Sequence, residues 1–123
     1  MPMTMEERKA QVKSYLGKNV SVEIDRPIGY VHVKGEKTLV YPINYGYIPG
    51  VLGGDDEELD VYVLGIDVPV EKAEGRIIGI AHREDDVEDK LIMAADGVLR
   101  TAEEMAEAVR FQEQYYHTRI EAL

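Results

Sequence analysis

Two helix-start signatures bracket a run of short alternating segments, and this order constrains the fold more than any other feature. Residues 4–7 (TMEE) and 101–104 (TAEE) each have the spacing of a capping box, in which a Thr N-cap is followed three residues later by Glu. We expect helices over about residues 5–16 and 102–118, with Gly17 ending the first.

Between the two helices, apolar and polar residues alternate as in strands with one buried face. The strand segments are 19–24, 29–34, 38–41, 59–66, 75–83 and 90–95. Residues 42–54 hold two prolines and four glycines, which predicts an ordered loop. Because helices do not alternate with the strands, we predict an α+β fold, a small closed five-stranded, mainly antiparallel, OB-like β-barrel with flanking N- and C-terminal helices. At 123 residues, the segment 1–123 is expected to be one domain.

Composition and charge narrow the function classes. The 24 acidic and 14 basic residues give a net charge of −10, which disfavours nucleic acid and anionic membranes as partners. No apolar run approaches the roughly 20 residues that cross a bilayer, and the first residues lack the apolar core of a signal peptide. The chain has no cysteine, which excludes disulfides and thiolate metal sites. We therefore expect a cytoplasmic protein.

The most unusual segment is an acidic run next to an apolar strand. Five of the six residues from Asp55 to Asp60 are acidic. On the following strand Asp60 shares a face with Tyr62 and Leu64, and a carboxylate beside apolar groups is costly unless it is paired or bound to a cation. A second acidic run, 84–89, could face the first and complete a site for Mg²⁺. On spacing alone, a solvated acidic loop explains the pattern equally well.

The order of the motifs is more specific than their charge. YPINYGYI at 41–48, followed by DDEELDV at 55–61, resembles the signature of the family I soluble inorganic pyrophosphatases. RIIGIAHREDDVEDKLI and FQEQYY are similar to later family segments, so that the resemblance spans roughly residues 20–116. The chain looks like a short, divergent member. The resemblance implies a pyrophosphatase-type barrel that hydrolyses pyrophosphate to two phosphates with Mg²⁺, or with Mn²⁺ as a substitute, and it allows a homo-oligomer.

The resemblance also implies roles for individual residues. Asp55 and Asp60 match metal-binding aspartates, and Lys90 matches a phosphate-contacting lysine. Tyr45 and Tyr115 match active-site tyrosines of the signature loop and the C-terminal helix. The remaining implied metal ligands are Asp86 or Asp89 with Glu88 close behind, and Glu23 for an additional ion.

Several positions depart from the family pattern. Glu57 stands where the family has the aspartate proposed as general base. Its extra methylene moves the carboxylate by about 1.5 Å. A misplacement of about 1 Å can lower a reaction rate about a hundredfold. Three usual cationic substrate contacts are missing, and Arg26 is one candidate to replace them. These departures keep two alternatives open: a non-catalytic relative that binds metal and a phosphate compound, and a hydrolase of another diphosphate.

Overall fold

Two helices and eight strands make up the described part of the computed structural model, which covers residues 4–52, 58–84 and 89–123. Along the chain they are α1 (Met5–Ser14), β1 (Asn19–Arg26), β2 (Val31–Lys34), β3 (Lys37–Val40), β4 (Asn44–Leu52), β5 (Glu58–Leu64), β6 (Lys72–Arg83), β7 (Lys90–Ala94), α2 (Ala102–Glu113) and β8 (Thr118–Ala122).

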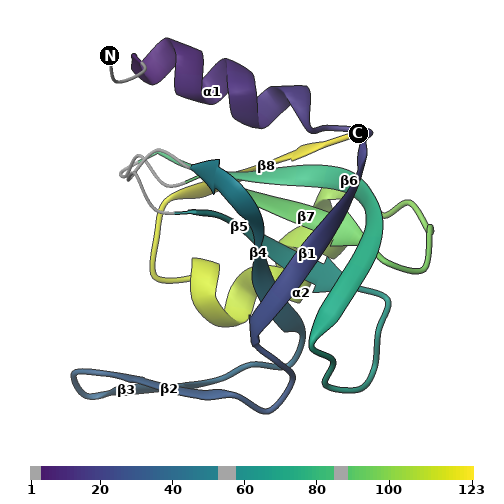
Figure 1. Ribbon diagram of the computed structural model, residues 1–123. Coiled ribbons are helices and arrows are strands. Elements are labelled where there is room, and N and C mark those ends of the chain that lie inside the picture. The colour runs from purple at the N-terminus through teal and green to yellow at the C-terminus, as the bar shows by residue number, and fades with distance from the viewer. Residues whose placement is uncertain (1–3, 53–57, 85–88) are drawn as a thin grey trace.

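Five of the strands close into a barrel (Figure 1). Their order is β1-β4-β5-β7-β6, and β6 pairs again with β1. The β5–β7 pair is parallel, whereas the other pairs are antiparallel. The long β6 pairs through residues 72–76 with β1 and through residues 79–83 with β8, so that β8 extends the sheet beyond the closed barrel. The predicted fold class, a small mainly antiparallel barrel with flanking helices, is confirmed.

Strand β5 shows how the sequence pattern builds two apolar layers. Leu59, Val61 and Val63 point into the barrel and belong to its inner cluster. Tyr62 and Leu64 point outward and join Met105 and Val109 of α2 in a second cluster. Because successive side chains of a strand alternate between its faces, Asp60 lies on the outer face, at the edge of the layer that α2 covers. The predicted mixed character of this face is confirmed.

The two helices occupy different places on the barrel. α1 lies across one end, near β8 (Figure 1), and its Val12 packs against the inner cluster. α2 lies against the outer face of the sheet. Both predicted capping boxes are present: the Thr4 and Thr101 side chains accept hydrogen bonds from the backbone N–H groups of Glu7 and Glu104.

Two expectations from the sequence were wrong, one for a loop and one for a helix end. Residues 44–52, expected within a loop, form β4, in which Gly46 packs so closely against β1 that a Cβ would overlap the Glu23 carbonyl. The prolines do not prevent this strand, because Pro42 precedes it and Pro49 lies where its pairing with β5 is irregular. The C-terminal helix ends at Glu113 instead of continuing to residue 118, and the chain then forms β8.

The β2–β3 hairpin projects from the closed barrel and forms a separate two-stranded sheet (Figure 1). Backbone hydrogen bonds hold its base, from the Gly29 N–H to the Tyr41 carbonyl and from the Tyr41 N–H to the Tyr30 carbonyl. Near the turn, the Lys37 ammonium lies 4.1 Å from the centroid of the Tyr115 ring, just beyond α2. The hairpin therefore spans a space between the sheet and the C-terminal segment.

Candidate functional site

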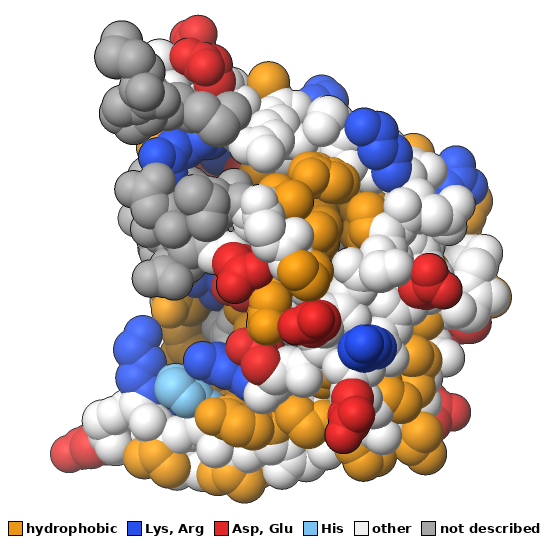
Figure 2. All heavy atoms as spheres, viewed as in Figure 1, with side chains coloured by type: hydrophobic (Ala, Val, Ile, Leu, Met, Phe, Trp, Pro, Cys, Tyr) orange, Lys and Arg blue, Asp and Glu red, His pale blue; other side chains and the backbone are white. Residues whose placement is uncertain are grey.

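A cavity of about 550 Å³ occupies the space between this hairpin, the outer face of the barrel and the end of α2. Figure 2 shows a hollow above the hairpin with basic side chains and a histidine at its rim. Among the described lining residues the one carboxylate is Asp60. Six lining side chains are basic or can become so: Arg26, His32, Lys34, Lys37, Arg83 and Lys90. Although the whole chain is acidic, this cavity is suited to an anion.

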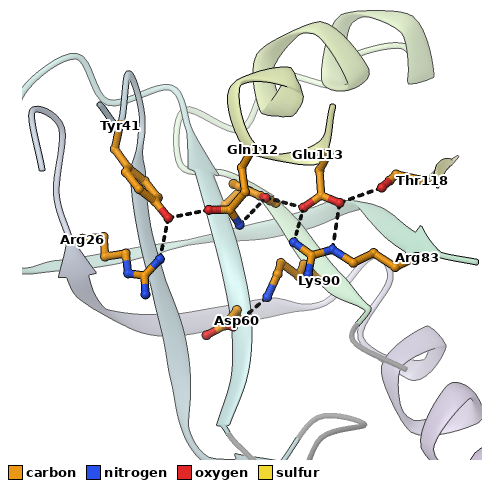
Figure 3. A network of polar contacts seen from close by, with 9 residues as sticks. Arg26, Tyr41, Asp60, Arg83, Lys90, Gln112, Glu113 and Thr118 are labelled. Carbon is orange, nitrogen blue, oxygen red and sulfur yellow. Dashed lines mark hydrogen bonds and ion pairs between the residues drawn. The ribbon is translucent and has the colours of Figure 1, made fainter. Parts of the chain in front are cut away.

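Asp60 and Lys90 form the floor of the cavity. The Lys90 ammonium donates a hydrogen bond to the Asp60 carboxylate, 2.8 Å away, as Figure 3 shows. The Lys90 side chain is 5% exposed and that of Asp60 is 28% exposed, so the lysine lies beneath and the carboxylate reaches toward solvent. Both residues come from outward-facing positions of neighbouring parallel strands, β5 and β7. An anion in the cavity could thus bind the Lys90 ammonium, and a metal cation could bind the Asp60 carboxylate.

Tyr45 is buried beside Asp60 and Lys90 and also lines the cavity. It pairs with Arg26 on β1 and with Tyr62 on β5, so the three side chains lie in one row on the outer face. Burial raises the pKa of Tyr45 well above its usual value, and the nearby Asp60 carboxylate, which accepts its hydrogen bond, raises it further. The Tyr45 hydroxyl therefore stays protonated near neutral pH and acts as a hydrogen-bond donor.

Aromatic rings position Arg26. Its guanidinium lies 5.6 to 5.7 Å from the ring centroids of Tyr30, Tyr41 and Tyr45, within the range of cation–π attraction. The guanidinium also donates a 2.5 Å hydrogen bond to the Tyr41 hydroxyl. These contacts hold a cation at the side of the cavity opposite Arg83, which is buried on β6 (Figure 3).

A buried hydrogen-bond network connects these two arginines through α2 (Figure 3). The Tyr41 hydroxyl donates to Gln112, whose amide donates to the Tyr62 hydroxyl over 2.9 Å. Tyr62 in turn donates to the Glu113 carboxylate over 2.5 Å. Arg83 reaches the same carboxylate through two hydrogen bonds, of 3.0 and 2.7 Å. No described buried side-chain polar atom is left without a partner, so the network is fully satisfied.

Stability should depend on pH through Glu113. Burial alone would raise the pKa of this carboxyl, but hydrogen bonds from Arg83 and Tyr62 outweigh burial and hold the pKa below its ordinary value of 4.5. A lowered folded-state pKa contributes stability that is present above the unfolded-state pKa and is lost as the pH falls through the folded-state pKa. We expect the urea midpoint of the wild type to fall more between about pH 5 and pH 3 than that of Glu113→Gln, which cannot titrate. Parallel declines of the two midpoints would contradict this assignment.

The structure brings five of the predicted site residues to the cavity, namely Arg26, Tyr45, Asp60, Lys90 and Tyr115. Two other predicted residues lie elsewhere. The Glu23 carboxylate accepts a 2.9 Å hydrogen bond from the Tyr47 hydroxyl outside the cavity lining. Four predicted residues fall outside the described part of the chain: Asp55, Glu57, Asp86 and Glu88.

Asp89 is the second residue that lies away from the cavity. It lies two positions before Leu91, so its side chain lies on the same inward face, and the residue is 5% exposed. Its carboxylate accepts hydrogen bonds of 3.0 and 3.2 Å from Lys9 of α1 and lies 3.2 Å from a ring nitrogen of His82. The structure therefore places Asp89 at the barrel end beneath α1. His82 is 7% exposed and lies between Asp89 and Glu121.

The described carboxylates near the cavity have oxygen atoms of the kind that bind a metal cation, but few of them lie close together. Burial raises the pKa of Asp25, and the negative charge of the nearby Asp60 raises it further. Oxygen ligands of this kind suit Mg²⁺. Within residues 4–52, 58–84 and 89–123, no three His, Asp or Glu side chains gather closely enough to hold a metal. A complete site would need donors from the two acidic segments outside these ranges.

Four further residues lie in or beside the cavity and were not predicted as site residues. Gln112 and Glu113 read as ordinary positions of an amphipathic helix, yet both are buried and polar in the structure. For His32 and Lys34 the sequence offered one indication. The alternation in VHVK places both side chains on the same face of the strand. In the part of the chain that the structure describes, no helix is long and apolar enough to span a membrane.

Comparison with protein families gives one match over most of the chain. The family described as "Inorganic pyrophosphatase" matches residues 12–121. Among curated proteins, the inorganic pyrophosphatase of Saccharolobus solfataricus is 36% identical over 84 residues, covering 64% of this chain and 49% of that protein. The Helicobacter pylori inorganic pyrophosphatase is 32% identical over 83 residues, covering 60% and 46%. This chain spans about half the length of these curated relatives.

Comparison with solved structures supports the fold. The crystal structure of inorganic pyrophosphatase from Ehrlichia chaffeensis matches with a TM-score of 0.62 and 19% identity, covering 87% of both chains. The inorganic pyrophosphatase from Neisseria gonorrhoeae matches with a TM-score of 0.56 and 20% identity, covering 80% of this chain and 74% of that one. At these identities the likeness concerns the arrangement of the barrel and helices alone.

Proposed function

Because this chain belongs to the inorganic pyrophosphatase family, we propose that it hydrolyses inorganic pyrophosphate to two phosphate ions with the help of Mg²⁺. The observation that carries the proposal is the Asp60–Lys90 pair on the floor of a cavity rich in basic side chains. Asp60 lies within the family signature, and Lys90 follows the second acidic run. This arrangement provides a carboxylate for a cation and a buried ammonium for a phosphoryl group.

Membership of the family implies a divalent metal cofactor, and we assign Mg²⁺ to that role, with Mn²⁺ as a substitute. Asp60 and Asp55 would hold it, together with a carboxylate from Asp86 or Glu88, and Glu23 would serve an additional ion outside the cavity lining. When bound, the metal supplies charge neutralisation of the phosphoryl oxygens and a lower pKa for a coordinated water. Asp60 fits this role in donor chemistry, since its carboxylate is partly exposed in the cavity.

The chain's own residues would bind and orient the diphosphate. Lys90 and Arg26 supply positive charge to the phosphoryl oxygens, and the Tyr45 and Tyr115 hydroxyls supply hydrogen bonds. Glu57 would accept a proton as water attacks phosphorus, a new P–O bond forms and the bridging P–O bond breaks. The buried Tyr41–Gln112–Tyr62–Glu113 network supports this geometry by fixing the arginines beside the cavity.

We propose that the protein acts in the cytoplasm as a single domain, without nucleic acid or membrane as partner, and that it can form a homo-oligomer. The net charge of −10 supports the exclusion of nucleic acid and membrane as partners, because phosphate-rich polymers and anionic membranes repel an acidic surface.

Phosphate release from pyrophosphate tests the activity. Purified protein should release phosphate in the presence of Mg²⁺, release it with Mn²⁺, and stop when a chelator removes the metal. A protein purified in parallel with the Asp60→Asn substitution controls for contaminating enzymes. A folded wild type that releases no more phosphate than this control would overturn the proposed activity and leave a non-catalytic binder as the better interpretation.

A further inference from the structure

We propose that Lys34 and Lys37 of the β2–β3 hairpin bind phosphoryl oxygens of the substrate, opposite the floor formed by Asp60 and Lys90. This inference rests on the proposed function, because it assigns additional substrate contacts to the same cavity. Neither lysine belongs to the positions that the family resemblance implies. Both are exposed and both line the cavity.

Strand pairing places the two lysines on the same face of the hairpin. Lys34 pairs directly with Lys37, and His32 pairs directly with Leu39, in an antiparallel register. Directly paired residues of two strands point to one side of the sheet. All four residues line the cavity. The intervening Val31, Val33 and Val40 point to the other side, where each is more than half exposed. The hairpin thus presents its basic face to the cavity and its apolar face to solvent.

The basic face has an electrostatic reason to bind an anion. Like charges directly opposite each other on paired strands are destabilising. No carboxylate in the described ranges forms an ion pair with either Lys34 or Lys37. A diphosphate in the cavity would relieve this repulsion, because each ammonium could donate charge-assisted hydrogen bonds to phosphoryl oxygens.

Aromatic contacts hold the basic side chains at the two ends of this face. The Lys37 ammonium lies over the Tyr115 ring, and the Arg26 guanidinium lies beside Tyr30 and Tyr41 at the hairpin base. A cation held against a ring loses less conformational freedom when it binds a ligand. Together with Lys90 beneath, these side chains surround the cavity with positive charge from both sides. The hairpin therefore supplies cations that the sequence signature lacks.

Binding of imidodiphosphate, a non-hydrolysable pyrophosphate analogue, tests the inference without turnover. The variants are Lys34→Gln, Lys37→Gln and the double variant. We expect Kd, measured by calorimetry with Mg²⁺, to rise about 10-fold in each single variant and about 100-fold in the double variant, as loss of charge-assisted hydrogen bonds requires. The KM for pyrophosphate should rise in parallel, whereas kcat should change less than about threefold, because these contacts are made in the ground state as well.

Three controls separate substrate binding from structural damage. Lys18→Gln removes an exposed lysine that lies 5.7 Å from the Tyr15 ring, away from the cavity, and should leave Kd unchanged. Val33→Thr alters the apolar face of the same hairpin and should also bind normally. Lys34→Arg with Lys37→Arg retains the charge and should recover most of the binding.

The possible results are distinguishable. A double variant that binds imidodiphosphate as tightly as Lys18→Gln would overturn the inference, even if the wild type hydrolyses pyrophosphate. A wild type that binds the analogue through the lysines but releases no phosphate would uphold the hairpin contacts and overturn the proposed hydrolysis. A folded wild type that does not bind the analogue would overturn both.

Discussion

Replacing Asp60 with asparagine should lower kcat for pyrophosphate hydrolysis by at least about 100-fold, the range found when one preorganised electrostatic group is lost from an active site. Asparagine has nearly the same shape, and its carbonyl oxygen can still accept the hydrogen bond from Lys90 that the carboxylate accepts in the wild type. The fold should therefore persist, while the negative charge that favours a bound cation is lost. Steady-state phosphate release at saturating Mg²⁺, together with Mg²⁺ titration by calorimetry, measures both effects.

The matched control for this prediction is Asp67→Asn. This is the same chemical change at an exposed position just beyond β5, outside the cavity. It should leave kcat within about twofold of the wild type, as expected for a surface substitution. If Asp60→Asn also retained kcat within threefold, Asp60 would have no part in the chemistry, and the carboxylate would be only the structural partner of Lys90.

Replacing Glu113 with alanine should destabilise the protein by about 3–5 kcal/mol, the cost of removing one partner from a buried ion pair. The carboxylate is 5% exposed and accepts hydrogen bonds from Arg83, Tyr62 and Thr118. Without it, the guanidinium of Arg83, which is 2% exposed, loses the two hydrogen bonds and the negative charge that Glu113 supplies. This loss would be a large part of the free energy of unfolding, which is typically about 5–15 kcal/mol for a folded domain. Urea unfolding at pH 7 measures it.

Glu107→Ala provides the control on the same helix. Glu107 is exposed on α2, so its replacement should change the free energy of unfolding by no more than about 0.5 kcal/mol. Replacing Arg83 with Met and Glu113 with Leu together should destabilise less than Glu113→Ala alone, because neither buried charge remains. A Glu113→Ala variant as stable as Glu107→Ala would show that the buried pair contributes little.

Local sequence signals predicted the elements best where short-range physics decides the conformation. The capping boxes at Thr4 and Thr101 begin the two helices because their hydrogen bonds join residues only three positions apart. The alternation along β5 predicted the mixed outer face with Asp60, since it follows from strand geometry. The segment 44–52 was assigned wrongly because Pro and Gly usually mark loops, while its strand depends on close contact between Gly46 and β1.

The cavity could be predicted only in part. Tyr45 and Asp60 of the signature segments meet there with Lys90, which follows the second acidic run. Lys34 and Lys37 could not be assigned from spacing, because their direction depends on how the hairpin returns over the sheet. Asp89 was equally undecidable within its acidic run, since one residue of register on a strand separates the outer cavity from the barrel end beneath α1.

The sequence by itself therefore determined the helix starts, most of the strands and the family signature, all of which depend on neighbours within a few residues or on a contiguous motif. Tertiary structure alone decided which side chains outside the signature segments share the cavity with Asp60. Barrel closure brings β1, β5 and β7 together with α2, and it converts Gln112 and Glu113 from helix-face residues into a buried network that fixes two arginines. The free energy of such a polar cluster comes from burial and from partners distant in sequence, which no local pattern specifies.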